Sequence, residues 1–236
     1  MNVQIIGPPG AGKTTLLRHL SRYGIANRTR YAPARDLSII FNLLRDVILS
    51  GKRATLTSTI LKSIDQGAGS AGSKCIPYLQ ICSDLLVSQN SSLEEIYVLW
   101  KRLIYQVYVW ERFHCSSKIG IYDDHFYQNI LSFCALREPA ANITSLLKNT
   151  PHPDVAIFLN RSPEDCLKNM MQRRRGPPRV LTGKSNAEIL RILQLCQRVT
   201  GVVKDAASDY GVKVIYDHEE ICPKELTAWL NHANSS

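Results

Sequence analysis

Short apolar runs alternate along the chain with longer segments in which apolar residues recur at helical spacing. The short runs are residues 3–6, 118–123, 155–159 and 212–216, and each is bounded by glycine, proline or polar residues. Such runs are typical of strands that are buried on both faces of a parallel sheet. We expect one further short strand near residues 30–32.

Helical spacing of leucine, isoleucine and valine fills much of the chain between these runs, and it predicts helices at residues 13–23, 37–63, 93–114, 188–208 and 224–232. A further helix is expected to begin at Pro163 and to run into the arginines at 173–175. Ser162 is a good N-cap, proline suits the first helical position and Asp165 completes a capping pattern. Strands that alternate with helices predict an α/β fold with a parallel sheet covered on both faces.

A complete phosphate-binding motif follows the first predicted strand. The pattern G-x-x-x-x-G-K-[ST] is met in full between a strand and a helix, which is the context that the motif requires. The alternative is a glycine turn with an incidental lysine, and the complete spacing in this context argues against it. The motif and its flanking threonine consist of Gly7, Pro8, Pro9, Gly10, Ala11, Gly12, Lys13, Thr14 and Thr15.

Each residue type in this loop has a chemical reason. Glycines let successive backbone N–H groups turn toward phosphate oxygens at the positive end of the helix dipole. Lys13 supplies a positive charge to the β- and γ-phosphates, the Thr14 hydroxyl is placed to ligate Mg²⁺, and Thr15 caps the α-phosphate. The loop therefore predicts binding of a nucleoside triphosphate, which we take to be ATP, with Mg²⁺.

Two carboxylates end the predicted strand at residues 118–123, where a P-loop protein places the acid that helps to hold Mg²⁺. Because neighbouring residues of a strand point to opposite faces, we assign the metal to Asp123 and keep Asp124 as a candidate base. In the alternative interpretation, these acids only cap the next turn. His125 is a candidate substrate contact, although a single histidine is more often a hydrogen-bonded structural residue.

Four arginines lie in a segment broken by Gly176-Pro177-Pro178, which we interpret as a lid at residues 172–185. Arginines on a loop can close over a triphosphate and neutralise charge in the transition state. We assign Arg173 and Arg175 to catalysis and Arg174 and Arg179 to nucleotide binding. A solvated basic helix end and an RNA-binding patch are the two alternatives.

Composition indicates the general class of protein but does not identify its binding partner. The net charge of +9 favours an anion, which could belong to a nucleotide, a sugar phosphate, nucleic acid or a membrane surface. No apolar run approaches the length of a membrane span and the N-terminus carries no leader pattern, so we expect a cytoplasmic protein with no membrane partner. Seven cysteines without a C-x-x-C pair predict reduced thiols that are mostly buried.

The order of these motifs resembles that of the P-loop nucleoside and nucleotide kinases, and of thymidylate-kinase-like proteins in particular. The matching pieces are GPPGAGKTT, IYDDH, FLNRSPEDCLKNMMQRRR and GVKVIYD, in chain order. The resemblance implies a three-layer α/β/α P-loop fold with a five-stranded parallel sheet, formed by a single domain over residues 1–236. It also implies ATP as the phosphoryl donor.

The same resemblance implies where the substrates bind. The acceptor would lie between the carboxyl edge of the sheet and an inserted helical region at residues 36–115, with Arg102 as the counterpart of an acceptor-binding arginine. The loop that begins at Asp217 would flank the adenine. Thymidylate kinases have Asp-Arg after the third strand and a glutamate beside a proline after the second, whereas this chain has DDH and YAPARD. These departures leave the acceptor open.

The favoured function is that of an ATP-dependent kinase whose small-molecule acceptor is a nucleoside, a nucleotide or a similar hydroxylated metabolite. Asp36 and Asp124 are the candidate acids near the acceptor hydroxyl. The alternative is a P-loop ATPase without a metabolite acceptor, acting on or regulated by a protein or nucleic-acid partner. A GTPase would need N-K-x-D, which NRSP at 160–163 replaces poorly, and no nucleic-acid recognition motif is present. The sequence is compatible with a homodimer.

Overall fold

The chain forms two compact units. Unit 1 comprises Met1–Thr29, Ser116–Leu147 and His152–Ser236, and unit 2 comprises Arg30–Cys115 and Lys148–Pro151. The region expected to hold an acceptor, residues 36–115, falls within unit 2, and its role stays a prediction. This computed structural model describes residues 1–27, 75, 77–82, 100, 102–107, 109–110, 113–114, 116–123, 125–137, 143–173, 176–178, 181–217 and 222–235.

A parallel sheet forms the centre of unit 1. Its strands are β1 (Asn2–Ile6), β2 (Ala26–Asn27), β3 (Gly120–Tyr122), β4 (Val155–Leu159) and β5 (Lys213–Asp217), in the spatial order β2-β3-β1-β4-β5. All four pairings are parallel. Because β1 lies between β3 and β4, every residue of β1 is buried, as expected for a strand covered on both faces.

The predicted α/β class with a parallel sheet is confirmed, but the five-stranded sheet expected from the resemblance is confirmed only in part. Four strands of three to five residues make up the sheet, and its fifth member, β2, is a pair of residues at the edge. The strand expected near residues 30–32 lies outside the described residues. The strand expected at 118–123 is shorter, because only Gly120–Tyr122 pair with neighbours.

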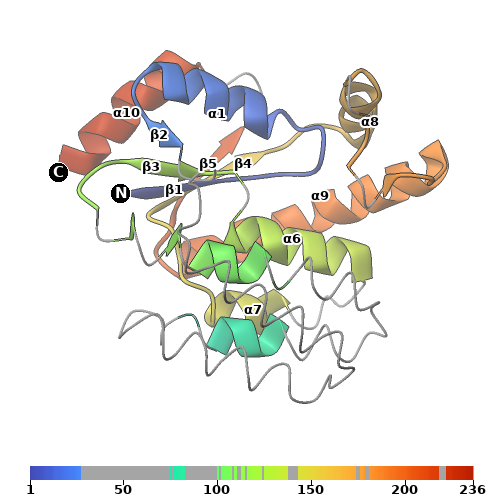
Figure 1. Ribbon diagram of the computed structural model, residues 1–236, viewed down its shortest axis with the longest axis horizontal. Coiled ribbons are helices and arrows are strands. Elements are labelled where there is room, and N and C mark those ends of the chain that lie inside the picture. Colours follow the sequence, from blue (N-terminus) through green and yellow to red (C-terminus); the bar gives the residue numbers. More distant parts are fainter. Residues whose placement is uncertain are drawn as a thin grey trace. The chain divides into compact units, whose positions relative to one another are not determined.

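Helices cover both faces of the sheet (Figure 1). On one face α1 (Lys13–Arg22) packs against α10 (Pro223–Ser235), and on the other α6 (Phe126–Arg137) packs against α9 (Asn186–Asp209). Two further helices are α7 (Ile143–Lys148) and α8 (Pro163–Met171), of which α8 contacts α9. The helices therefore complete the three layers of an α/β/α arrangement.

Local capping explains where two of these helices begin. The Ser162 hydroxyl accepts a hydrogen bond from the Asp165 N–H at 3.0 Å, so the predicted start of α8 is confirmed. The helix ends at Met171, before the arginines that it was expected to include. At α9, Ser185 and Glu188 form a complete capping box, which sets the first residue of the helix two positions earlier than predicted.

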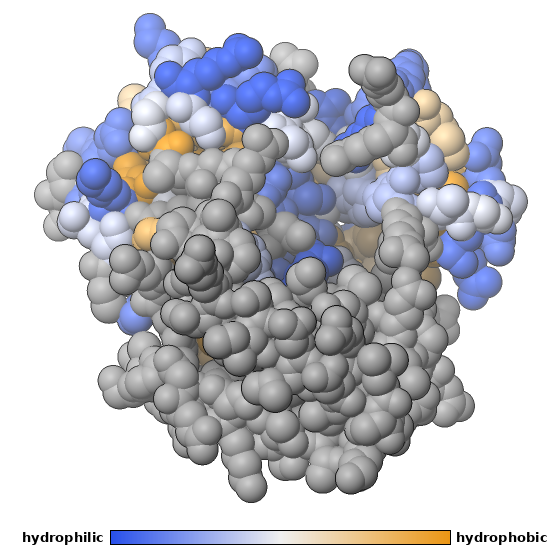
Figure 2. Space-filling view, viewed as in Figure 1, coloured by the Kyte–Doolittle hydropathy of each residue, from blue (hydrophilic) through white to orange (hydrophobic). Residues whose placement is uncertain are grey.

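The apolar core of unit 1 joins the sheet to the helices on its faces. Leu16, Leu17 and Leu20 project from one side of α1, as their helical spacing predicted. The buried members from the strands and the other helices include Val3, Ile5, Ile121, Val155, Ile157, Leu159, Met170, Ile189, Leu193, Leu226 and Leu230. Hydrophilic residues gather over the outer side of α1, where Arg18, Ser21 and Arg22 are exposed (Figure 2).

Two expectations about the chain as a whole can be compared with the described residues. No helix in the described part of the chain is both long and apolar enough to cross a bilayer. Six of the seven cysteines are described, and none of these six is in a disulfide. Five of them are buried and Cys222 is exposed, as the sequence predicted for mostly buried thiols.

The His152 side chain packs between two tyrosines of unit 1. The Tyr127 hydroxyl lies 2.8 Å from His152 Nδ1, and the His152 ring stacks on Tyr210 with centroids 4.5 Å apart. Burial raises the pKa of Tyr127 well above its usual range and lowers the pKa of His152. Tyr127 therefore keeps its O–H group and His152 is favoured in its neutral form, and one hydrogen bond joins the two side chains.

This arrangement predicts a loss of stability in mild acid. The pKa of His152 in the folded protein lies below its unfolded value of about 6.5. The stabilisation that the buried neutral ring adds to the free energy of unfolding is therefore complete above that pH, and it is lost as the pH falls through the lowered pKa. The free energy of unfolding, measured by urea titration from pH 7 to pH 5, should fall less in His152→Phe than in the wild type. The exposed-site control His232→Gln should keep the wild-type slope. Equal slopes for His152→Phe and the wild type would contradict this assignment.

Candidate functional site

The phosphate motif forms the turn between β1 and α1, at the carboxyl edge of the sheet. Gly10 and Gly12 have φ angles of +94° and +99°, a region that only glycine adopts without strain. Gly12 is the N-cap of α1, so no side chain caps this helix. The first turn of α1 also contains no acidic residue. By contrast, serine side chains cap α8 and α9. The positive end of α1 is therefore arranged to receive an anion.

Lys13 folds back over the loop. Its Nζ donates hydrogen bonds to the carbonyl oxygens of Gly7 and Pro8, the latter at 3.0 Å. Burial lowers the pKa of Lys13 to about 8, and the nearby Asp123 carboxylate opposes this shift. Burial raises the pKa of the neighbouring Cys196 and Cys166 thiols to about 12 and 11, so they are uncharged near pH 8. Asp123 is thus the anion that matters for Lys13.

Helix α8 approaches the loop backbone very closely at Gly10. A Cβ built on Gly10 would lie 2.2 Å from the carbonyl oxygen of Cys166, so no side chain fits at this position. One turn further along α8, Asn169 Nδ2 donates to the Gly10 carbonyl at 3.1 Å. The loop is therefore shaped by α8 as well as by its own glycines.

Asp123 follows β3, the strand that pairs directly with β1. Parallel strands end at the same edge, so the acid and the phosphate loop share that edge of the sheet. Asp123 is half-buried, and Asp124 lies outside the described residues. His125 is only 3% exposed and packs against the rings of Tyr122 and Phe126. This burial favours a structural role over the predicted substrate contact.

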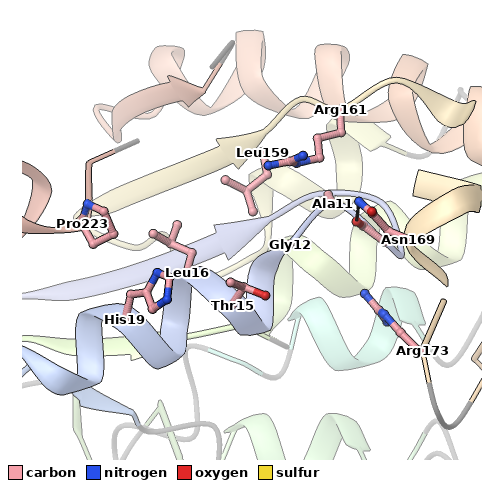
Figure 3. A pocket seen from close by; sticks show the side chains of 11 residues that line it. Ala11, Gly12, Thr15, Leu16, His19, Leu159, Arg161, Asn169, Arg173 and Pro223 are labelled. Carbon is pink, nitrogen blue, oxygen red and sulfur yellow. Dashed lines mark hydrogen bonds between the residues drawn. The ribbon is translucent and has the colours of Figure 1, made fainter. Parts of the chain in front are cut away.

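A cavity of about 510 Å³ opens beside the loop (Figure 3). One wall comes from α1, through Thr15, Leu16 and His19, and another from the residues at and after the end of β4, Leu159 and Arg161. The cavity is also lined by Asn169 and Arg173, and by Pro223 at the start of α10. It therefore has a polar end at the phosphate loop and a mainly apolar end between Leu16, Leu159 and Pro223.

The predicted lid is described only in part. Arg173 is half-buried, lines the cavity and acts electrostatically on Lys13, which places one predicted arginine at the site. Arg174, Arg175 and Arg179 lie outside the described residues. Gly176 has a φ of +65° and its N–H bonds to the Arg173 carbonyl, so the chain turns directly after α8.

The remaining predicted contacts fall elsewhere in the chain. Asp217 is the last residue of β5, and residues 218–221 after it are not described. Arg102 lies in a helical segment of unit 2, and Asp36 is outside the described residues. Their expected roles stay predictions.

Sequence reasoning did not single out as site residues six that line the cavity: Leu16, His19, Leu159, Arg161, Asn169 and Pro223. His19 could have been found, because it lies four residues after Thr15 and so shares its helix face. Arg161 lies near the loop, with its Nε 3.9 Å from a Cβ built on Gly12. Finding Arg161, Asn169 and Pro223 requires the strand order, which the sequence did not provide.

Comparisons with known proteins yield distant structural matches only. The chain aligns with deoxyadenosine kinase from M. mycoides, with bound dATP (12% identity, TM-score 0.43) and with bound dCTP (14% identity, TM-score 0.45), over 100% of both chains in each case. It also aligns with shikimate kinase from Acinetobacter baumannii in complex with shikimate, at 14% identity and a TM-score of 0.37, over 98% of this chain and 91% of that chain. No protein-family model and no curated protein sequence matches the chain. Similarity this distant does not assign an activity.

The close approach at Gly10 predicts a graded response to alanine. Gly24, in the turn after α1, also has a positive φ of +85°, but nothing lies within 4 Å of a Cβ built there. Gly24→Ala should therefore cost about 1 kcal/mol of unfolding free energy from backbone strain alone. Gly10→Ala should cost at least about 3 kcal/mol, because it adds overpacking against α8. Urea unfolding at pH 7.5 measures both values, and equal losses would contradict the observed contact.

Proposed function

We propose that this protein binds ATP with Mg²⁺ and transfers the γ-phosphoryl group to a small hydroxylated acceptor, such as a nucleoside or a nucleotide. The observation that carries the proposal is the complete phosphate loop at the uncapped start of α1, with Lys13 folded over it. The loop, the acid after the adjacent strand and one lid arginine all belong to unit 1.

The triphosphate would lie along the loop, with its negative charge at the start of α1. Backbone N–H groups of the loop would hold the phosphate oxygens, and Lys13 would leave the Gly7 and Pro8 carbonyls to reach the β- and γ-phosphates. Thr15 is exposed at the cavity, which supports its expected contact with the α-phosphate. Arg173 would neutralise charge on the transferred group.

The residues present suit a magnesium ion. Mg²⁺ prefers oxygen ligands and keeps several waters, so a hydroxyl and a carboxylate are an appropriate protein contribution. Thr14 is the second residue of α1, and Asp123 lies at the edge of the sheet where α1 begins. These two residues would hold the ion, which when bound neutralises phosphate charge. Asp124 remains the proposed base for the acceptor hydroxyl.

The apolar end of the cavity would hold the nucleobase. Leu16, Leu159 and Pro223 provide apolar contacts for the base. The His19 imidazole and the Arg161 guanidinium are planar groups that can stack on the base and donate hydrogen bonds to it. The chain after Asp217 is proposed to complete this end of the site. Asp36 and Arg102 remain proposed acceptor contacts, and the acceptor region remains 36–115.

The first test is ATP consumption with Mg²⁺ across a panel of nucleosides, nucleoside monophosphates and sugars. Release of ADP should depend on one acceptor class and should fall by at least about 100-fold in Lys13→Ala, because the transition-state charge loses its main cation. Gly24→Ala, which alters a turn outside the site, serves as a variant control and should keep wild-type turnover. If ATP binds but no acceptor stimulates turnover, the kinase proposal is wrong and the P-loop ATPase with a macromolecular partner replaces it.

The lowered pKa of Lys13 predicts a pH dependence of nucleotide binding. A bound triphosphate favours the charged ammonium, so binding raises the Lys13 pKa above its value of about 8 in the ligand-free protein. The affinity for ATP should therefore be constant below about pH 7.5 and fall by up to about tenfold per pH unit above pH 8. Calorimetric titration from pH 7 to pH 9.5 measures this slope.

The control for this slope is Lys13→Met, which has no titrating amine and should bind weakly with an affinity that changes little over the same range. Calorimetry at pH 8.5 in two buffers of different ionisation enthalpy should also reveal proton uptake by the wild type alone. A wild-type affinity that is flat from pH 7 to pH 9.5 would contradict the assigned role of Lys13.

A further inference from the structure

Buried polar side chains connect β1 to α6 beneath the phosphate loop. Gln4 on β1 is 1% exposed, and Gln128 on α6 is 7% exposed. A buried amide destabilises a fold unless hydrogen bonds satisfy it, so each of these residues requires partners. Their hydrogen-bond partners are backbone or side-chain groups at the start of α6 and at the start of the loop.

Gln128 holds the first peptide of the phosphate loop. Its Oε1 accepts a hydrogen bond from the Gly7 N–H at 3.1 Å, in a buried position. The carbonyl of the same residue, Gly7, accepts the hydrogen bond from Lys13 Nζ. Gly7 therefore connects the amide of Gln128 with the ammonium group of Lys13.

The position of Gly7 leaves little room for adjustment. A Cβ built on Gly7 would lie 2.9 Å from the carbonyl oxygen of Leu159 on β4, which is closer than real Cβ contacts. Leu159 thus limits the movement of the Gly7 backbone toward β4, while Gln128 anchors its N–H from α6. Loss of the Gln128 acceptor would release one of these two restraints and leave a buried N–H unsatisfied.

Gln4 keeps Gln128 in place. The Gln4 Oε1 accepts from the N–H of Tyr127, which is in the first turn of α6 and has no partner within the helix. The Gln4 Nε2 faces His125 Nδ1 at 3.5 Å, and the His125 ring packs against Phe126. The start of α6, and with it Gln128, is therefore fixed to β1 rather than resting on apolar contacts alone.

We propose that Gln128 is a positioning residue of the phosphate site, which fixes the Gly7 peptide and thereby the resting place from which Lys13 reaches the triphosphate. This inference rests on the proposed function, because it concerns the same loop and the same ligand. Gln128 does not itself line the cavity or touch the nucleotide, and it acts through Gly7 and Lys13.

The test is a double-mutant cycle on ATP affinity, with MgATP as the probe. Gln128→Met keeps the length of the side chain and removes the acceptor, and we expect it to weaken MgATP binding about fivefold, the effect of one hydrogen bond. In the Lys13→Met background the same change should weaken binding by less than about twofold, because the ammonium group through which Gln128 acts on the nucleotide is absent. A merely structural role would give the same factor in both backgrounds.

Two further measurements separate positioning from general destabilisation. Ile130→Val trims a fully buried residue of the same helix, so it should lower thermal stability while leaving MgATP affinity within about twofold of the wild type. In the ligand-free protein, the Gly7 amide should exchange with deuterium about fivefold faster in Gln128→Met than in Ile130→Val.

The outcomes distinguish this inference from the proposed function. If the wild type binds no MgATP, the proposed function fails and the inference fails with it. If the wild type binds MgATP but Gln128→Met binds equally well, or weakens binding by one factor in both backgrounds, only the positioning role is overturned. Unchanged exchange of the Gly7 amide in Gln128→Met would also overturn it.

Discussion

The approach of α8 to the loop backbone at Gly10 is the contact on which the shape of the site depends. The carbonyl of Cys166 occupies the place where a side chain of residue 10 would lie, and Asn169 hydrogen-bonds the Gly10 carbonyl. Because this contact involves backbone atoms of both segments, it fixes the turn more narrowly than side-chain packing could. It also places the end of α8, and Arg173 beyond it, beside the phosphate loop.

Apolar and polar interactions have separate tasks in unit 1. The core between the sheet and its helices brings the carboxyl ends of β1, β3 and β4 to one edge, through non-directional burial. Hydrogen bonds then determine which groups face the site, since they require defined distances and angles. Gln128 on α6 bonds to Gly7 and Asn169 on α8 bonds to Gly10, so two different helices hold two points of the same loop. Burial within this packing lowers the pKa of Lys13.

Local sequence signals predicted much of the fold and one side of the site. The strand at 155–159, the cap at Ser162 and the loop between β1 and α1 were all predicted, because each depends on neighbouring residues. Helix α6 was not predicted, because residues 126–131 are all buried and include the polar Gln128 and Asn129, so apolar residues do not mark one face at 3.6-residue spacing. Arg161 and Pro223 reach the cavity only through the spatial order of the strands. The end of α8 at Met171 was missed because the arginines that follow are themselves good helix formers.

The dependence of the loop on α8 limits how far its nine residues can act alone. If GPPGAGKTT were grafted between a strand and a helix of another scaffold, Gly10 would keep its freedom at positive φ but would lose the neighbour that selects one conformation from that freedom. The transplanted peptide would populate several conformations in the absence of phosphate, and the cost of ordering it would weaken binding. A portable version of this module therefore has to include the distant segment that begins at Ser162, although more than 140 residues of chain separate the two.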